Sequence, residues 1–313
     1  MSEGRDMLVA APERWDETCF AVPAVRALRQ SGLATGVLCP EDQCEFWETL
    51  AGVEIMGFPP KAKPKAVATM LDDGWKASLA WSGGAAAAAF AQVGISRRLG
   101  PDEKALRKLL THPLEIRPGP LEHRVRFYLG TVEALGIEAL APSFFAPADL
   151  GIETQAGTVM ICPESDFGPS HEWPVERWET VAAALRSDGL RVTVAGLSGG
   201  RGMARRLADS LEGVEYFDAN PIAGALPLLA VHQLLVAADG SLPHLAAYAG
   251  STCVTLFGPN DPSWKRPLGR RHTVVRRHVE CAPCLLAKCP LDHRCQRELE
   301  AEEVLAAVRA ALA

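Results

Sequence analysis

The sequence has no long hydrophobic run. None of its apolar stretches approaches the roughly 20 residues that a helix needs to span a bilayer. No apolar segment follows a basic stretch near the N-terminus, as a secretory leader would require. We therefore expect a cytoplasmic protein.

Basic charge is not in excess either. The chain has 32 Lys and Arg residues against 38 Asp and Glu, a formal net charge of -6, so no overall basic field attracts nucleic acid. We expect no nucleic-acid partner.

Hydrophobic residues make up 48% of the 313 positions, which is ample for buried cores and excludes a disordered chain. A chain of this length predicts two domains.

Strand-like and helix-like segments alternate along both halves of the chain, which predicts parallel sheets with helices on both faces. In the first half we expect strands at 7–11, 34–39, 53–58 and 77–81, and helices at 22–30, 42–50, 65–71, 83–93 and 122–136. In the second half we expect strands at 159–162, 192–195, 214–217, 234–238 and 253–257, and helices at 175–187, 203–211, 223–231 and 300–312. Residues 139–157 are rich in Pro and Ala and are the predicted linker. The prediction is an α/β fold with two doubly wound domains, at residues 1–148 and 149–313.

The most informative segment lies at residues 234–267. An apolar run ends at Asp239, Gly240 and Ser241, and a short Ala-rich helix begins near Pro243. Ligands of open α/β sheets bind at the carboxyl ends of strands, where helix N-termini hold anions. With Ser241 as the N-cap, the first-turn N–H groups would face a phosphate beside His244. The alternative is an ordinary strand–helix–strand unit with a capped helix.

Two other segments follow predicted strands in the same way. Ser165 and His171 lie between a strand and a helix of the second half, so we expect them at the same sheet edge. Their alternative is a simple strand–turn–helix connection. Asp16 follows the first strand, where an aspartate is commonly a helix N-cap.

These three segments resemble glycosyltransferase family 9, the ADP-heptose:lipopolysaccharide heptosyltransferases. Residues 239–247 (DGSLPHLAA) and 256–262 (LFGPNDP) resemble D-S/T-G-x-x-H-x-A-A and a-x-F/Y-G-P-x-x-P, with the Gly and Ser in reversed order. Residues 162–174 (CPESDFGPSHEWP) resemble C-P-G-A-E-F-G-P-A-K-R-W-P and are most similar to heptosyltransferase II sequences. Asp16 matches the aspartate of the family's G-D loop, with Trp15 in place of the glycine.

The resemblance implies a GT-B fold, in which two Rossmann-like domains face each other across a cleft. The first domain would lie on the acceptor side, with Asp16 as the catalytic base. The second would bind a nucleotide-sugar donor through six residues: Ser165, His171, Asp239, Gly240, Ser241 and His244. The implied reaction is inverting transfer of a heptose from an ADP-linked donor to a lipopolysaccharide-core-type acceptor, a lipid- or saccharide-linked molecule, with peripheral contact at the inner face of the membrane.

The chain departs from the family where the donor would bind. His171 and Glu172 replace a basic pair, which predicts either a weaker nucleotide-sugar site or a different donor. No two aspartates have D-x-D spacing, in agreement with catalysis that needs no metal cofactor. The departures leave two rivals open: a non-catalytic sugar-nucleotide-binding or scaffold protein, and a GT-B transferase with a UDP- or GDP-linked donor. A nicotinamide-dependent oxidoreductase is disfavoured because no strand is followed by G-x-G-x-x-G.

Four of the nine cysteines cluster near the C-terminus, at Cys281, Cys284, Cys289 and Cys295. Four thiols with this spacing, and His293 as a substitute ligand, form a tetrahedral zinc pattern that also recurs in family 9. We expect either a structural zinc or a loop of reduced thiols. The other five cysteines are scattered and are expected to be small buried side chains.

Overall fold

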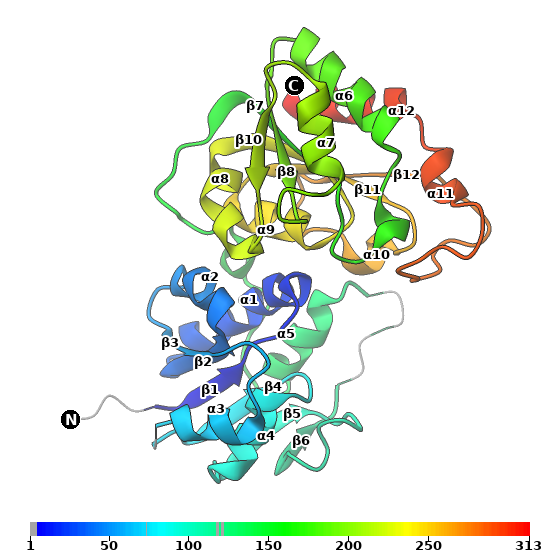
Figure 1. Ribbon diagram of the computed structural model, residues 1–313. Helices are drawn as coiled ribbons and strands as arrows, with labels where there is room; N and C mark the ends of the chain where they lie inside the picture. Colours follow the sequence, from blue (N-terminus) through cyan, green and yellow to red (C-terminus); the bar gives the residue numbers. More distant parts are fainter. Residues whose placement is uncertain (1–4, 73, 117–118, 120–121) are drawn as a thin grey trace. The chain divides into compact units, whose positions relative to one another are not determined.

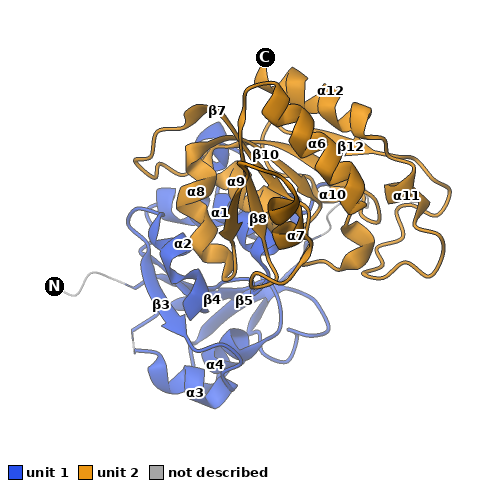
Figure 2. Cartoon of the chain, turned by 45° about the horizontal axis from the view of Figure 1, so that its top comes forward, with its two compact units in different colours: residues 1–146 blue, residues 147–313 orange. Residues whose placement is uncertain are grey.

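A computed structural model describes residues 5–72, 74–116, 119 and 122–313 (Figure 1). The chain divides into two compact units, Met1–Ala146 and Pro147–Ala313, which are coloured separately in Figure 2. The boundary expected from the sequence, after residue 148, lies two residues further along the chain. In the described part of the chain, no helix combines the length and the apolar character that crossing a membrane requires.

The first unit is built on a six-stranded parallel sheet with the order β3-β2-β1-β4-β5-β6. Its strands are β1 (Met7–Ala10), β2 (Thr35–Pro40), β3 (Glu54–Phe58), β4 (Ala77–Ala80), β5 (Arg97–Pro101) and β6 (His112–Leu114). Its helices are α1 (Trp15–Gln30), α2 (Cys44–Glu48), α3 (Pro64–Met70), α4 (Ala85–Gln92) and α5 (Val125–Glu133), with 3-10 turns at Glu41–Gln43 and Pro142–Phe145. The central strands β1, β2 and β4 are buried throughout, as expected for a sheet covered by helices on both faces.

The second unit repeats this topology in a sheet with the order β12-β11-β10-β7-β8-β9. Its strands are β7 (Gln155–Cys162), β8 (Arg191–Gly196), β9 (Glu215–Asp218), β10 (His232–Ala238), β11 (Thr252–Phe257) and β12 (Thr273–Arg276). Its helices are α6 (Val175–Ser187), α7 (Met203–Ser210), α8 (Leu226–Val231), α9 (Ser241–Ala249), α10 (Pro262–Lys265), α11 (Arg294–Arg297) and α12 (Ala301–Leu312), with 3-10 turns at Pro169–His171 and Ile222–Ala225. Figure 1 shows α6 and α12 together on one face of the sheet and α8 and α9 on the other.

Each sheet reverses its strand order at one place. Counted along each unit, both orders are 3-2-1-4-5-6, the Rossmann order, so the reversal falls between β1 and β4 in one sheet and between β7 and β10 in the other. The loops that leave neighbouring strands there diverge and create a crevice at the carboxyl edge. The predicted α/β fold with two Rossmann-like doubly wound domains is confirmed.

Three strands are absent from the sequence prediction: β5, β6 and β12. Strands β6 and β12 lie at the sheet edges, and all three are short and include Arg or His, so they lack an apolar run.

The start of α1 was also predicted wrongly. The helix begins at Trp15 rather than at residue 22, and Pro23 lies inside it. Burial of Trp15 and Phe20 outweighs the local preference that places a proline in the first turn.

Candidate functional site

The loops that follow β7 and β10 lie together at the reversal point of the second sheet. The two strands pair in parallel, with Val236 opposite Ile161 and Ala237 opposite Cys162. The Ser165 hydroxyl donates to the backbone carbonyl of Asp239 at 2.5 Å, which joins the two loops directly. The structure therefore brings together two segments that are 74 residues apart in the sequence.

Asp239 is the centre of this edge. Its side chain is fully buried, and its Oδ2 lies 3.0 Å from His171 Nδ1 and accepts a hydrogen bond of 2.6 Å from Asn260 Nδ2. Burial raises the pKa of Asp239, while the hydrogen bond and charge of His171 and the amide of Asn260 oppose that rise. Oδ1 is buried and accepts no hydrogen bond from any group in the described residues. A buried acceptor without a donor is costly, so a local shift that brought a donor to this oxygen would stabilise the edge.

The N-terminus of α9 is arranged differently from the prediction. Gly240, not Ser241, is the N-cap residue, and Ser241 is the first helical residue. Asp166 accepts both Ser241 donors, the backbone N–H at 2.8 Å and the hydroxyl at 2.6 Å. A side-chain carboxylate thus holds the anion position where we expected a phosphate. Gly240 leaves room for this contact, because a Cβ there would lie 2.9 Å from Asp166 Oδ1.

A second carboxylate ties the loop after β7 to the loop after β8. Glu164, which is 5% exposed, accepts hydrogen bonds from Leu197 N at 2.7 Å, Ser198 Oγ at 2.8 Å and Ala204 N at 2.9 Å. The Ala204 contact lies in the first turn of α7, so Glu164 also stabilises the positive end of that helix. The glycine-rich segment 196–202 is therefore held by a side chain of the loop after β7.

The remaining predicted residue, His244, lies one turn into α9 and is 2% exposed. Sequence reasoning named Ser165, His171, Asp239, Gly240 and Ser241, and all five lie at this edge. It missed three residues that complete the hydrogen bonding: Glu164, Asp166 and Asn260. These three residues could have been found in the sequence, because all of them lie inside the two motif segments.

The predicted base lies in the first unit, at the start of α1. Asp16 is the second residue of the helix rather than its cap, and its side chain is fully buried. Both carboxylate oxygens pair with the Arg14 guanidinium, at 3.1 and 3.2 Å. The loop before it is held by Gln43, whose Nε2 donates to the carbonyls of Pro12 at 2.9 Å and Glu13 at 3.2 Å.

The neighbouring Glu17 has a different environment. It pairs with Arg124 at 2.9 Å and accepts a short hydrogen bond from the Tyr128 hydroxyl. Asp16 and Glu17 thus pair with different arginines, and Asp16 is one residue closer to the loop at the reversal point of the first sheet.

Comparisons with known proteins agree with this geometry. The family model described as glycosyltransferase family 9 (heptosyltransferase) matches residues 138–294, half of the chain. The chain belongs to glycosyltransferase family 9. This confirms the family resemblance, and the matched range contains two of the three segments, 162–174 and 239–262.

Individual relatives give the same result. Lipopolysaccharide heptosyltransferase 2 of Salmonella typhimurium is 25% identical over 135 residues, which are 41% of this chain and 39% of that protein. Lipopolysaccharide heptosyltransferase 1 of Pseudomonas aeruginosa is 33% identical over 118 residues, 37% of this chain and 33% of that protein. The chain therefore spans about two-fifths of the length of the curated relatives it matches.

A solved structure extends the likeness of the fold to both units. The E. coli ADP-heptose lipopolysaccharide heptosyltransferase II has a TM-score of 0.81 at 18% identity, over 98% of each chain. This supports the GT-B type of fold. Within family 9, the matched range 138–294 includes the loops of Ser165, His171 and Asp239, whereas Asp16 lies outside it.

The family 9 cysteine segment has no assembled metal site. Cys281 is exposed, Cys284 and Cys289 are half-buried, Cys295 is buried, and all four are free thiols. Among the described residues, no group of three or more His, Cys, Asp or Glu side chains is placed to hold a metal ion. His293 is engaged elsewhere, with Nε2 at 2.7 Å from the carbonyl of Ser170. Burial and the neighbouring Cys281, Cys284 and Cys289 raise the pKa of Cys295 to about 11, so the four thiols lie near one another. The described residues show no zinc site at this segment.

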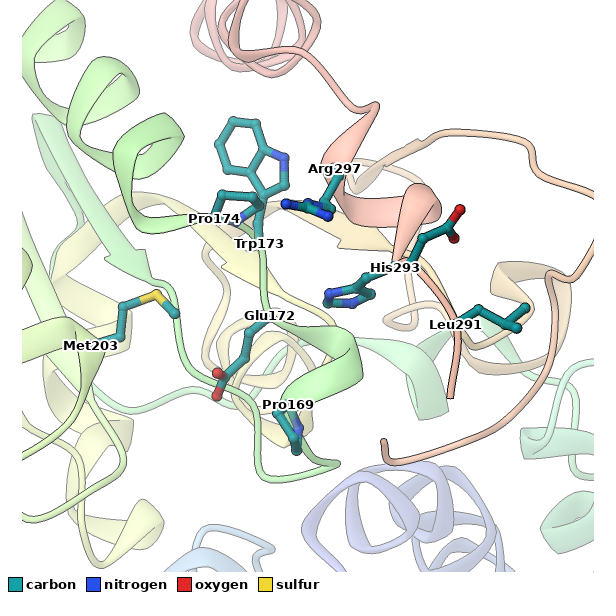
Figure 3. Close-up of a pocket in the computed structure, with 9 residues that line it drawn as sticks. Pro169, Glu172, Trp173, Pro174, Met203, Leu291, His293 and Arg297 are labelled. Atoms are coloured by element: carbon teal, nitrogen blue, oxygen red, sulfur yellow. The ribbon is translucent and has the colours of Figure 1, made fainter. Parts of the chain in front are cut away.

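A cavity of about 390 Å³ lies beside this segment (Figure 3). Its walls combine apolar and charged side chains, namely Pro169, Glu172, Trp173, Pro174, Met203, Leu291, Asp292, His293 and Arg297. Burial raises the pKa of Glu172, against a hydrogen bond from Ser165 N that lowers it. His171 and Asp239 do not line this cavity, so it is distinct from the edge at the reversal point.

Proposed function

We propose that this family 9 chain is a heptosyltransferase that moves a heptose from an ADP-linked donor to a lipopolysaccharide-core-type acceptor. The observation that supports it most is the buried Asp239 beside His171 at the reversal point, with one carboxylate oxygen left without a donor. A sugar hydroxyl would supply such a donor after a local shift of the groups that bury the oxygen. The heptosyltransferases among its relatives act on lipopolysaccharide by name.

The donor would lie against the second unit and contact Ser165, His171, Asp239, Gly240, Ser241 and His244. The His171 imidazole contacts Asp239 directly, and the positive charge of Lys265 also acts on Asp239. These groups and the N-terminus of α9 would stabilise the departing diphosphate. Asp166 already satisfies Ser241, so the diphosphate would share that helix end with a carboxylate or displace it.

The reaction would proceed with inversion and without a catalytic metal. Asp16 would take the proton from the acceptor hydroxyl, whose oxygen attacks the anomeric carbon on the side opposite the diphosphate. The bond between that carbon and the diphosphate oxygen breaks, and ADP leaves with the electron pair. The acceptor is lipid- or saccharide-linked, so the proposal includes a cytoplasmic protein with peripheral contact at the inner face of the membrane.

The test combines donor binding with transfer. Purified protein is screened by thermal shift against ADP-, UDP- and GDP-linked sugars and is then incubated with the stabilising donor and a heptose-deficient lipopolysaccharide core. The expected result is stabilisation by ADP-heptose, release of ADP and a product heavier by one heptose. Binding of a UDP- or GDP-sugar alone would establish a different donor. Binding without transfer to the acceptor would establish a non-catalytic sugar-nucleotide protein.

A further inference from the structure

The segment between β12 and α11 exposes an unusual amount of apolar surface. We call residues 281–292 the leucine loop. Leu285, Leu286 and Leu291 are 54%, 44% and 68% exposed, and they are three of the seven large apolar side chains that are exposed in the described residues. Figure 1 shows this segment as a long excursion from the second unit that returns through α11. Exposed apolar side chains gathered in one segment indicate an interaction surface.

The backbone of the leucine loop is fixed, although its leucines point to solvent. Leu285 N donates to Pro259 O at 2.9 Å, Ser170 N donates to Ala287 O at 3.1 Å, and the Ser170 hydroxyl donates to Leu286 O. Gly168 allows this close approach, since a Cβ there would lie 2.5 Å from Ala287 O. These hydrogen bonds fix the backbone in the conformation that exposes the leucines.

One leucine is held in an unfavourable conformation. Leu285 has a φ of 60°, in the left-handed region that residues with a side chain rarely adopt. Such conformations persist only where the surroundings impose them, and they concentrate at functional sites. Here the imposed conformation presents an apolar side chain to solvent, where it gains nothing from burial in this chain.

The charge of the surrounding segment is opposite to that of the whole chain. Residues 276–297 carry five basic residues and two acidic ones, whereas the chain has a net charge of -6. Both acidic residues, Glu280 and Asp292, pair with Arg294, at 2.8 and 3.3 Å. Lys288, within the leucine loop, and Arg297 are exposed. The leucines are thus accompanied by positive charge.

We propose that the leucine loop is a docking surface for an anionic phospholipid bilayer. Leucines that enter the boundary between headgroups and acyl chains, with Lys and Arg at the headgroups, are the combination that holds peripheral proteins on such membranes. Three leucine side chains offer far less area than the roughly 800 Å² per partner of a stable protein interface. The observations therefore favour a lipid surface over a second copy of the chain.

The position of the leucine loop connects it to the donor site. Its backbone bonds to Ser170, which precedes His171, the partner of Asp239. Docking would hold the donor loop close to the bilayer that carries a lipid-linked acceptor. This consequence rests on the proposed function, whereas the docking itself does not.

Vesicle flotation tests the docking. Wild-type protein is mixed with vesicles of phosphatidylcholine alone or with phosphatidylglycerol added, at low and high salt. We expect binding to the anionic vesicles that weakens with salt, and at least a roughly tenfold loss of partitioning when Leu285, Leu286 and Leu291 are all replaced by Ser. The matched control replaces Met70, Leu140 and Ile152, which are exposed elsewhere, and should partition like wild type.

Two further measurements separate the outcomes. Circular dichroism and the melting temperature show whether the triple leucine variant is folded, and transfer to a soluble core saccharide shows whether its active site is intact. Docking is wrong if folded wild type binds no vesicle, or if the triple variant partitions as wild type does. A concentration-dependent dimer that the same substitutions abolish, with no vesicle binding, would assign the surface to a second copy. If wild type transfers no heptose to the soluble saccharide, the proposed function is contradicted. The result of the vesicle experiment is unaffected by that outcome.

Discussion

His171 takes the place where family 9 has a lysine, and the exchange removes a fixed ammonium charge from this position. The imidazole is 3% exposed and its Nδ1 faces the buried Asp239 carboxylate. A side chain held in this way has less freedom to reach a ligand than the flexible stem of a lysine has. The attraction for a diphosphate at this position would therefore be weaker in this chain.

This difference predicts that a lysine at this position strengthens donor binding. The His171→Lys variant should bind ADP-heptose about tenfold more tightly than wild type, which corresponds to one charge-assisted hydrogen bond. Titration calorimetry measures both affinities, with His278→Lys, at an exposed position, as the control. Equal affinities of wild type and the His171→Lys variant would remove position 171 from this role.

Asp16 permits a prediction about turnover. The Asp16→Asn variant keeps the shape of the side chain and removes its basicity, so turnover should fall by ~10²–10⁴, the usual contribution of a general base. Donor affinity should be nearly unchanged, because the proposed donor contacts lie in the other unit. Glu13→Gln, an exposed residue of the same loop, is the matched control. Wild-type turnover in the Asn variant would show that Asp16 has only a structural role beside Arg14.

At the scale of elements, Glu164 connects the loop after β7, the glycine-rich segment and α7. Replacing it by Ala leaves Leu197 N, Ser198 Oγ and Ala204 N without their acceptor. We expect the variant to lose about 1–3 kcal/mol of stability, the cost of unsatisfied buried donors. Hydrogen exchange should accelerate at 197–206 and stay slow in β10. Glu212→Ala, at an exposed position, is the control, and equal exchange in both variants would contradict the role of Glu164.

The elements also show which features a sequence can predict. Helix α6 was predicted with its observed bounds, because Pro174 precedes it and the apolar spacing is regular. Strands β6 and β12 escaped prediction because edge strands need no apolar run. The motif segments were correctly placed at one sheet edge by the rule for parallel sheets. The Asp166–Ser241 contact was not predictable. The residues around Asp166 in the sequence do not indicate whether its carboxylate caps a helix from another segment or faces solvent.

At the scale of the whole molecule, the repeated 3-2-1-4-5-6 order gives each unit its own reversal point, and each point carries one part of the proposed chemistry. The alternation of strands and helices was sufficient to predict two such sheets. The pairing of side chains across loops 74 residues apart was not, because it depends on tertiary packing.

The stability of the whole chain should depend on pH through His272. The pKa of His272 is lowered to about 4, mainly by burial. A hydrogen bond with the Leu268 carbonyl opposes this shift, and the positive charges of Arg271 and Arg266 add to it. Its Nδ1 accepts a hydrogen bond of 3.2 Å from Cys253 N at the start of β11, which requires the neutral ring. The unfolded chain therefore binds a proton at this residue more readily than the folded chain does.

The sign follows from that difference. Stability from neutral His272 is fully present above about pH 6.5 and is lost as the pH falls toward 4, by up to about 3 kcal/mol. The His272→Asn variant cannot titrate there, so the gap between wild type and variant in the free energy of unfolding should change by that amount between pH 7 and 4. Denaturation at several pH values measures the gap, with His278→Asn, at an exposed position, as the control. A gap that stays constant with pH would show that the buried ring of His272 contributes nothing to acid unfolding.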